Sequence, residues 1–266
     1  MFRLAMLLSL ALLAGCAAAP EARSAATDPQ RITPADADDA VVQRIRADKV
    51  GFLREVFGRS DALDQYRLTF YRQERLGLIP RLGEMEEIRA AFRRKPFSVR
   101  FEWPSADAAY FESVYVAGQN NGKLIVRERK GALLGLPPTT RQLDPDDPVK
   151  LGRSKNPITD FGLARVAERT LLPFNDPATR EVMKIEYEGL VTLEPTGQKA
   201  HYFRIERPPM PGLLYTRQDF YVDAETLLPA GTDLYLENGE LDARYRYAQV
   251  DPRVNLTDDD FRLTGK

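Results

Sequence analysis

The chain has 266 residues, of which 38 are basic and 39 acidic, with a single histidine and a single cysteine. This charge balance lacks the basic excess that binds nucleic acid, so we expect no nucleic-acid partner. A lone cysteine excludes an internal disulfide, and a lone histidine argues against a zinc site built from several imidazoles.

Residues 1–15 are typical of a bacterial export signal, because Arg3 near the amino end is followed by an apolar run. The run is shorter than the ~20 residues that a transmembrane helix needs. It ends in Leu13-Ala-Gly-Cys16, which resembles the lipobox, the motif in which the cysteine is acylated and becomes the new amino terminus. We therefore expect Cys16 to carry a lipid anchor that holds the protein on a membrane.

The residue after the cysteine, Ala17, is not an aspartate. By the sorting rule known for enterobacterial lipoproteins, this implies the periplasmic face of the outer membrane. Cleavage leaves 37 basic side chains (38 less Arg3) against 39 acidic ones, a net charge of −2. Residues 16–36, with the lipidated Cys16 at their start, have no apolar periodicity and predict a flexible tether. Residues 37–266 are expected to form a single domain.

The first folded elements are predicted from two different periodicities. Apolar residues between Asp36 and Phe57 have helical spacing, interrupted at Lys49 and Gly51, and predict an amphipathic helix. Alternation then predicts strands over Tyr66–Glu74 and Glu84–Arg93.

Residues 96–130 predict an antiparallel meander of three strands. The first strand covers 97–103, where apolar and polar residues alternate, and the others cover Glu112–Ala117 and Lys123–Arg129. The turn signal Gly118-Gln-Asn-Asn-Gly122 separates the last two strands, because Gly and Asn tolerate positive φ.

The remainder of the chain predicts a second helix and five more strands. The helix is expected to start at Asn156-Pro157 and to stop at Pro173. The five strands are expected over Val182–Leu193, Ala200–Arg207, Thr216–Asp223, Thr232–Leu236 and Leu241–Val250. The predicted fold is mainly β (α+β), a curled antiparallel sheet of roughly ten strands with a helical cover.

Few residues predict catalysis. His201 shares a strand face with Phe203 and Ile205, which indicates a packed or rim histidine more than a catalytic one. Two acidic clusters, at 144–147 and 258–260, are interpreted as a solvated turn and a cap, so we expect no metal and no cofactor. A non-enzymatic protein is the favoured interpretation, and a hydrolase of cell-envelope glycan or lipid is the minor one.

Apolar side chains of the meander are the candidate ligand site. If they share one face, either the helices cover that face completely or the curled sheet leaves an apolar cavity for a lipid chain. The pattern alone favours complete cover. These side chains are Phe97, Val99, Phe101, Trp103, Val114, Val116, Leu124 and Val126.

Several segments resemble known exported domains. One bacterial family of unknown function is similar over Tyr66–Arg75, Arg94–Arg100 with Trp103, Tyr115–Lys123 and Ser154–Gly162. The carboxyl end resembles the outer-membrane lipoprotein-sorting proteins, the carrier and its lipid-anchored acceptor, over Asp219–Pro229, Tyr247–Val250 and Asp259–Phe261. In that group the fold is a half-open β-barrel with a helical lid, whose interior takes up acyl chains. The resemblance therefore favours the cavity over the filled sheet.

The expected function is that of a lipid-anchored binding module that holds an acyl chain or another amphiphile, in lipoprotein or lipid trafficking. The alternative is the same fold with a filled core, acting as a structural or sensory protein-interaction module of the cell envelope. The acceptor protein has an exposed apolar loop that meets the membrane. Two loops here are candidates for that contact or for a partner surface, with the side chains Leu133, Leu134 and Leu136, or Met210, Leu213 and Leu214. The equal alternative is that each loop folds back and plugs the barrel.

Overall fold

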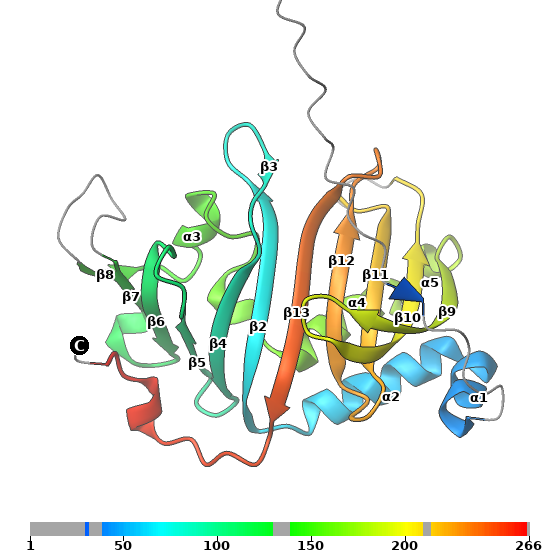
Figure 1. Ribbon diagram of the computed structural model, residues 1–266, viewed down its shortest axis with the longest axis horizontal. Coiled ribbons are helices and arrows are strands. Elements are labelled where there is room, and N and C mark those ends of the chain that lie inside the picture. The colour runs from blue at the N-terminus through cyan, green and yellow to red at the C-terminus, as the bar shows by residue number, and fades with distance from the viewer. Residues whose placement is uncertain (1–29, 32–38, 130–138, 210–213, 265–266) are drawn as a thin grey trace, which may run out of the picture.

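The structure is a computed structural model, which describes residues 30–31, 39–129, 139–209 and 214–264. Its centre is one antiparallel sheet that curls without closing, with β1 and β8 at its two free edges (Figure 1). The order across the sheet is β1-β9-β10-β11-β12-β13-β2-β4-β5-β6-β7-β8, and the short β3 pairs with β2. The predicted curled antiparallel sheet with helices on it is confirmed.

The strands match the predicted alternating segments closely. Three short ones, β1, β3 and β8, were not predicted, because two to four residues are too few to show a period. The bounds are β1 Gln30–Arg31, β2 Gln65–Leu76, β3 Arg81–Leu82, β4 Glu86–Arg93, β5 Ser98–Glu102, β6 Tyr110–Val116, β7 Leu124–Glu128, β8 Thr140–Leu143, β9 Lys184–Leu193, β10 Gln198–Glu206, β11 Arg217–Asp223, β12 Pro229–Tyr235 and β13 Leu241–Asp251.

The first predicted helix is two helices, α1 (Ala40–Ala47) and α2 (Lys49–Asp61). Asp48 separates them in an extended conformation, and its Oδ1 accepts a hydrogen bond from the backbone N of Gly51 at 2.7 Å. A side-chain cap of this kind satisfies one of the free N–H groups at a helix start. The prediction of a single continuous helix is therefore wrong, although the interruption of the apolar pattern at Lys49 and Gly51 lies at this break.

The second predicted helix begins later than its sequence signal. A 3-10 turn, η2 (Ile158–Asp160), comes first, and α4 (Leu163–Asn175) starts after Gly162. Gly162 has φ +140°, and a Cβ there would lie 3.3 Å from the Phe92 ring, so a larger residue would be strained. Pro173 does not stop the helix, which continues to Asn175. The short helices are α3 (Asp147–Lys150), α5 (Pro177–Arg180), η1 (Asn120–Gly122) and η3 (Asp258–Phe261).

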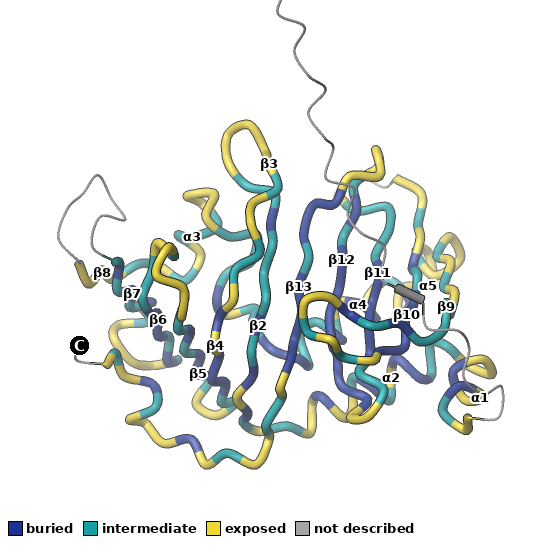
Figure 2. The backbone as a smooth tube through the Cα atoms, in the orientation of Figure 1, coloured by how far each residue is buried: buried dark blue, intermediate teal, exposed yellow. Residues whose placement is uncertain are grey.

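Helices cover one end of the concave face. There α2 and α4 lie side by side and pack on β10 and β11, through Leu53, Leu171, Phe203 and Phe220 among others. The concave face of β2, β4, β5 and β13 carries a separate aromatic cluster centred on Phe70. Figure 2 shows buried residues along β2, β12 and β13, in the middle of the sheet.

The outer face is covered in two places. The far end of the β9–β10 hairpin folds across β11–β13 in Figure 1, and Val191 and Leu193 there cluster with Tyr221 and Ala230. At the other end, Leu256 and Phe261 of the carboxyl-terminal segment pack against β4 and β6. Both coverings leave the concave face open to the site described next.

Candidate functional site

A cavity of about 500 Å³ lies between the concave face of the sheet and the segment from Pro148 to Pro173. This volume is within the range of ~300–1,000 Å³ that is usual for small-molecule sites. Its apolar lining comes from both halves of the sheet and from α4. The apolar and aromatic lining residues include Phe70, Phe101, Trp103, Tyr110, Leu124, Val126, Leu143, Ile158, Phe161, Val166, Leu172, Met183, Ile205, Leu234, Tyr245 and Tyr247.

Aromatic rings form the rigid part of this lining. Phe70 on β2 lies 5.9 Å from Tyr245 and 5.4 Å from Tyr247, measured between ring centroids. These residues meet because β2 pairs with β13, with Phe70 directly opposite Tyr247. Offset stacked rings at such distances hold one another in place, so this wall of the cavity is preformed.

Phe161 crosses the cavity from the opposite side. It precedes α4 and lies 4.8 Å from Phe101 and 5.4 Å from Phe70, edge to face with both rings. The chain segment that carries it, residues 153–162, lines the cavity at nearly every position. This segment therefore forms the cover of the cavity over its middle.

A polar cluster marks one side of the cavity. Glu74 is buried at the end of β2 and accepts a hydrogen bond of 2.5 Å from the Tyr245 hydroxyl. Asn156 Nδ2 donates to the same hydroxyl at 3.1 Å, and the backbone N of Lys155 donates to Glu74 at 3.3 Å. Burial, followed by the Glu74 charge, raises the pKa of Tyr245 well above its ordinary value, so the phenol stays protonated. The cluster ties the cover to the sheet.

Sequence comparison gives a family for the chain. Residues 63–265 match a family of proteins of unknown function, DUF1571. The chain belongs to this family. Comparison of this DUF1571 chain with curated protein sequences gives no match.

Solved structures with a similar fold share little sequence with this DUF1571 chain. The MucA/MucB complex of Pseudomonas aeruginosa has 16% identity and a TM-score of 0.45, over 81% of this chain and 61% of that one. The Mycobacterium tuberculosis lipoprotein LppX has 7% identity and a TM-score of 0.39, over 78% and 97%. A putative outer membrane lipoprotein-sorting protein domain from Vibrio parahaemolyticus has 9% identity and a TM-score of 0.31, over 80% and 95%. The chain spans less than two thirds of the length of the MucB chains that it matches.

Four of the eight predicted ligand-site residues line the cavity: Phe101, Trp103, Leu124 and Val126. Val99 is fully buried in the same cluster without lining the cavity, and Phe97 is half-buried against that cluster. The indole Nε1 of Trp103 is buried and has no hydrogen-bond partner among the described residues.

The placement of Val114 and Val116 on this face is wrong. In the DUF1571 fold, Val114 lies opposite Arg100 and Val116 opposite Ser98, so both valines point to the outer face. There they pack with Leu256 and Phe261. The error arose because each face of β6 carries both apolar and polar side chains, Glu112 beside Val114 and Ser113 beside Tyr115, so a period of two does not show which face is inward.

The sequence prediction missed the part of the lining that comes from β2, β13 and the cover. Phe70 and Tyr247 were in predicted strands, but nothing local shows that these strands pair. Phe161 was expected inside a helix and instead precedes it. The sequence signal that could have pointed to the lining residues of β2 and β13 was the alternation of aromatic residues with arginine in both strands.

His201 is buried, as predicted. Its Nδ1 is 2.9 Å from the Tyr187 hydroxyl, and its ring meets Phe52 of α2 at 6.2 Å. Burial lowers the pKa of the imidazole below its ordinary value, so it is neutral at pH 7. It does not line the cavity.

Both acidic clusters are paired with basic side chains. Asp144 and Asp146 bind Lys123 and Lys150, each at 2.8 Å. Asp258, Asp259 and Asp260 bind Arg93, Arg262 and Arg67, and Asp260 also closes a capping box with Thr257. Across the described ranges, no three His, Cys, Asp or Glu side chains converge as metal ligands.

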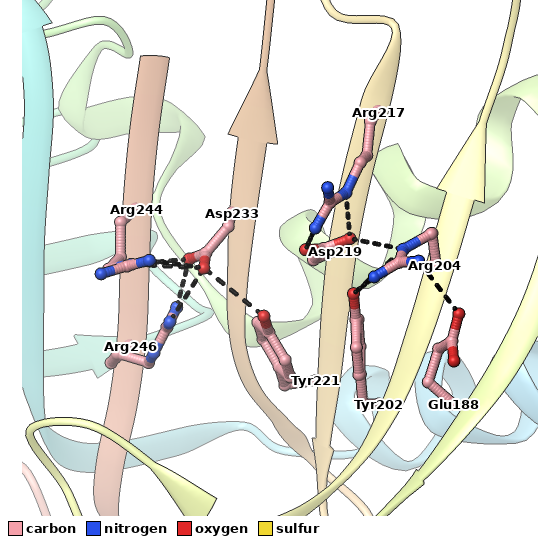
Figure 3. A network of polar contacts seen from close by, with 9 residues as sticks. All are labelled: Glu188, Tyr202, Arg204, Arg217, Asp219, Tyr221, Asp233, Arg244 and Arg246. Atoms are coloured by element: carbon pink, nitrogen blue, oxygen red, sulfur yellow. Dashed lines mark hydrogen bonds and ion pairs between the residues drawn. The ribbon is translucent and has the colours of Figure 1, made fainter. Parts of the chain in front are cut away.

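A second polar network lies on the outer face of β9–β13, and of its members only Arg217 is among the residues that line the cavity (Figure 3). Asp233 on β12 accepts hydrogen bonds from Arg246 at 2.6 and 3.1 Å and from Arg244 at 3.2 Å. Burial alone would raise the pKa of Asp233, but the two guanidinium groups outweigh it and hold the pKa below its ordinary value. A carboxylate held in this way is a structural tie between strands, with no free lone pair for acid–base chemistry.

The expected membrane or partner loops fall largely outside the described residues, which holds for Leu133, Leu134, Leu136, Met210 and Leu213. Leu214 is described and is 72% exposed. The prediction overlooked Leu78 and Ile79, which are 103% and 74% exposed at the tip of the β2–β3 hairpin. Figure 1 shows this tip extending past the end of the sheet.

Cys16 also lies outside the described residues. Within the part of the chain that the structure describes, no helix has the length and apolar character to cross a bilayer.

Proposed function

We propose that the protein is a lipid-anchored, non-enzymatic binding module at the periplasmic face of the outer membrane. It holds an acyl chain, or an amphiphile with one, in the cavity of its half-open sheet. The cavity of about 500 Å³, walled by aromatic and aliphatic side chains, is the observation that carries this proposal. Burial of apolar surface supplies the binding free energy, at ~25 cal/mol per Å2 less the cost of ordering the ligand.

The anchoring half of the proposal rests on the sequence. Leu13-Ala-Gly-Cys16 supplies the acylation motif, and residues 17–29 supply the tether. The predicted tether is shorter than residues 16–36, because Gln30–Arg31 form β1 and pair with β9. Leu78 and Ile79 give the domain an apolar hairpin tip that suits the lipid interface, and the exposed Arg81 on β3 of that hairpin suits a lipid phosphate. Glu74, which lines the cavity, precedes Arg75, so the cavity reaches the same end of the sheet as this tip.

Fluorescence titration tests the proposal. The chain with Cys16→Ser, which cannot be acylated, is titrated with a fatty acid that carries an environment-sensitive fluorophore. We expect saturable binding, and at least tenfold weaker binding in Leu234→Trp, because the indole would fill part of the cavity. Leu151→Trp is the matched control, since Leu151 is 62% exposed and outside the lining. Absence of binding, or equal binding by both variants, would favour the alternative in which the fold serves protein interaction alone.

A further inference from the structure

Arginines line the cavity in two classes. Three of the five form ion pairs with carboxylates, and two do not. The paired ones are Arg72 with Glu86, Arg169 with Asp160 and Arg217 with Asp219, each at 2.5 Å. Among the described residues, Arg153 and Arg207 have no carboxylate within ion-pair distance.

Arg207 is the more enclosed of these two. It follows β10, and its Nε donates a hydrogen bond to the backbone oxygen of Tyr215. Neither Nη1 nor Nη2 donates to a described protein atom. Burial lowers the pKa of the guanidinium, since no acid close by offsets the lost solvation. The site therefore holds a partly desolvated cation with two free donor groups.

A bound anion would compensate the lost solvation of the Arg207 guanidinium and accept hydrogen bonds from its free N–H groups. A guanidinium presents parallel N–H donors that fit a carboxylate or phosphate oxygen pair, and such charge-assisted bonds are stronger than neutral ones. The neighbouring lining includes apolar side chains: Met183 and Ile205 line the cavity near Arg207, and Leu234 continues it across β12. A charged group at Arg207 therefore has room for an attached hydrocarbon chain beside it.

We propose that Arg207 binds the acidic head group, carboxylate or phosphate, of an amphiphile whose chain lies in the cavity. This inference rests on the proposed function and names the chemical class of its ligand. It also sets the ligand's direction, with the head at the β10–β11 end and the chain running toward Phe161 and Trp103.

Arg153 provides the contrast. It is exposed, its guanidinium donates to the Tyr110 hydroxyl, and it lies 5.8 Å from the centroid of the same ring. Tyr110 belongs to β6, which is separated from β10 in the sheet by β11, β12, β13, β2, β4 and β5. The two unpaired arginines therefore mark opposite ends of the cavity, and exchanging each in turn tells which end holds the head group.

Calorimetric titration of the Cys16→Ser chain with dodecanoate, dodecyl phosphate and dodecanol at pH 8 tests the inference. The three ligands share a chain and differ in head-group charge. We expect both anions to bind ten- to a hundredfold more tightly than dodecanol, the range of a hydrogen bond to a charged group. Arg207→Gln should remove most of this preference while changing the dodecanol affinity less than twofold. Arg207→Lys should keep part of it, and Arg153→Gln should keep it all.

The outcomes distinguish failure of this inference from failure of the proposed acyl-binding function. Equal affinity for the three ligands, or loss of the preference in Arg153→Gln instead of Arg207→Gln, would overturn the head-group assignment and leave the acyl cavity standing. Displacement of dodecanoate by inorganic phosphate alone at comparable concentration would show a free-anion site and overturn the amphiphile. Binding of none of the three would refute both proposals. Thermal unfolding of each variant confirms that it is folded.

Discussion

Asp233 is the single side chain whose loss should destabilise the sheet most. Its carboxylate is fully buried between Arg246, which is 3% exposed, and Arg244, which is 14% exposed. Asp233→Asn leaves two guanidinium groups in the outer face without a counter-ion. Breaking a buried ion pair from one side costs about 3–5 kcal/mol, because the remaining charge keeps its desolvation cost. With a urea m-value near 3 kcal/mol/M, the midpoint should fall by about 1 to 1.7 M.

Urea denaturation followed by circular dichroism measures this shift. Asp251→Asn is the matched control, since Asp251 lies on β13 and its partner Arg253 is 91% exposed at 3.6 Å. That exchange should cost less than about 0.5 kcal/mol, as exposed ion pairs do. A midpoint for Asp233→Asn close to that of Asp251→Asn would refute the view that the network ties β12 to β13.

Four further predictions follow from the same geometry. Folding lowers the pKa of Asp233, so its contribution to the free energy of unfolding is complete above the unfolded pKa of about 3.9 and is lost as the pH falls through the folded pKa. In Asp233→Asn, the free energy of unfolding should therefore depend less on pH below pH 4. Alkanoates should bind about fourfold more tightly per added methylene until the chain reaches the end of the cavity, and a calorimetric series without that slope would contradict apolar burial. Leu78→Asp with Ile79→Asp should weaken binding to anionic vesicles at least tenfold in a flotation assay, with dodecanoate binding unchanged; Val182→Asp is the exposed control. The His201 imidazole should titrate below pH 6.5 by NMR, and a higher value would contradict its burial beneath α2.

Strand positions were predictable because most strands of this sheet are long and alternate. β2, β4 and β9–β13 each match a predicted segment to within a few residues. Helix boundaries were harder, since they depend on single caps: Asp48 splits the first helix by bonding Gly51, and Gly162 delays the second. The apolar pattern is interrupted at the first of these breaks, but an interruption alone does not show that a new helix begins there.

The cavity was predictable only in part, because its lining is assembled from strands far apart in the chain. Trp103 and Phe101 come from one local pattern, whereas Phe70 and Tyr247 meet only through the β2–β13 pairing. A strand with apolar and polar side chains on each face, such as β6, does not reveal which face is inward, and so Val114 was misplaced. The unpaired Arg207 has no sequence signal at all, since its distinction is the absence of an acid beside it.

The central claim is that the cavity holds an acyl chain. Native mass spectrometry of the Cys16→Ser chain, purified from the periplasm of an expression host without detergent, tests it most directly. The account predicts a bound mass that extracts as lipid and that is reduced in Leu234→Trp. A bare protein mass, unchanged after incubation with phospholipid or acylated peptide, would contradict it.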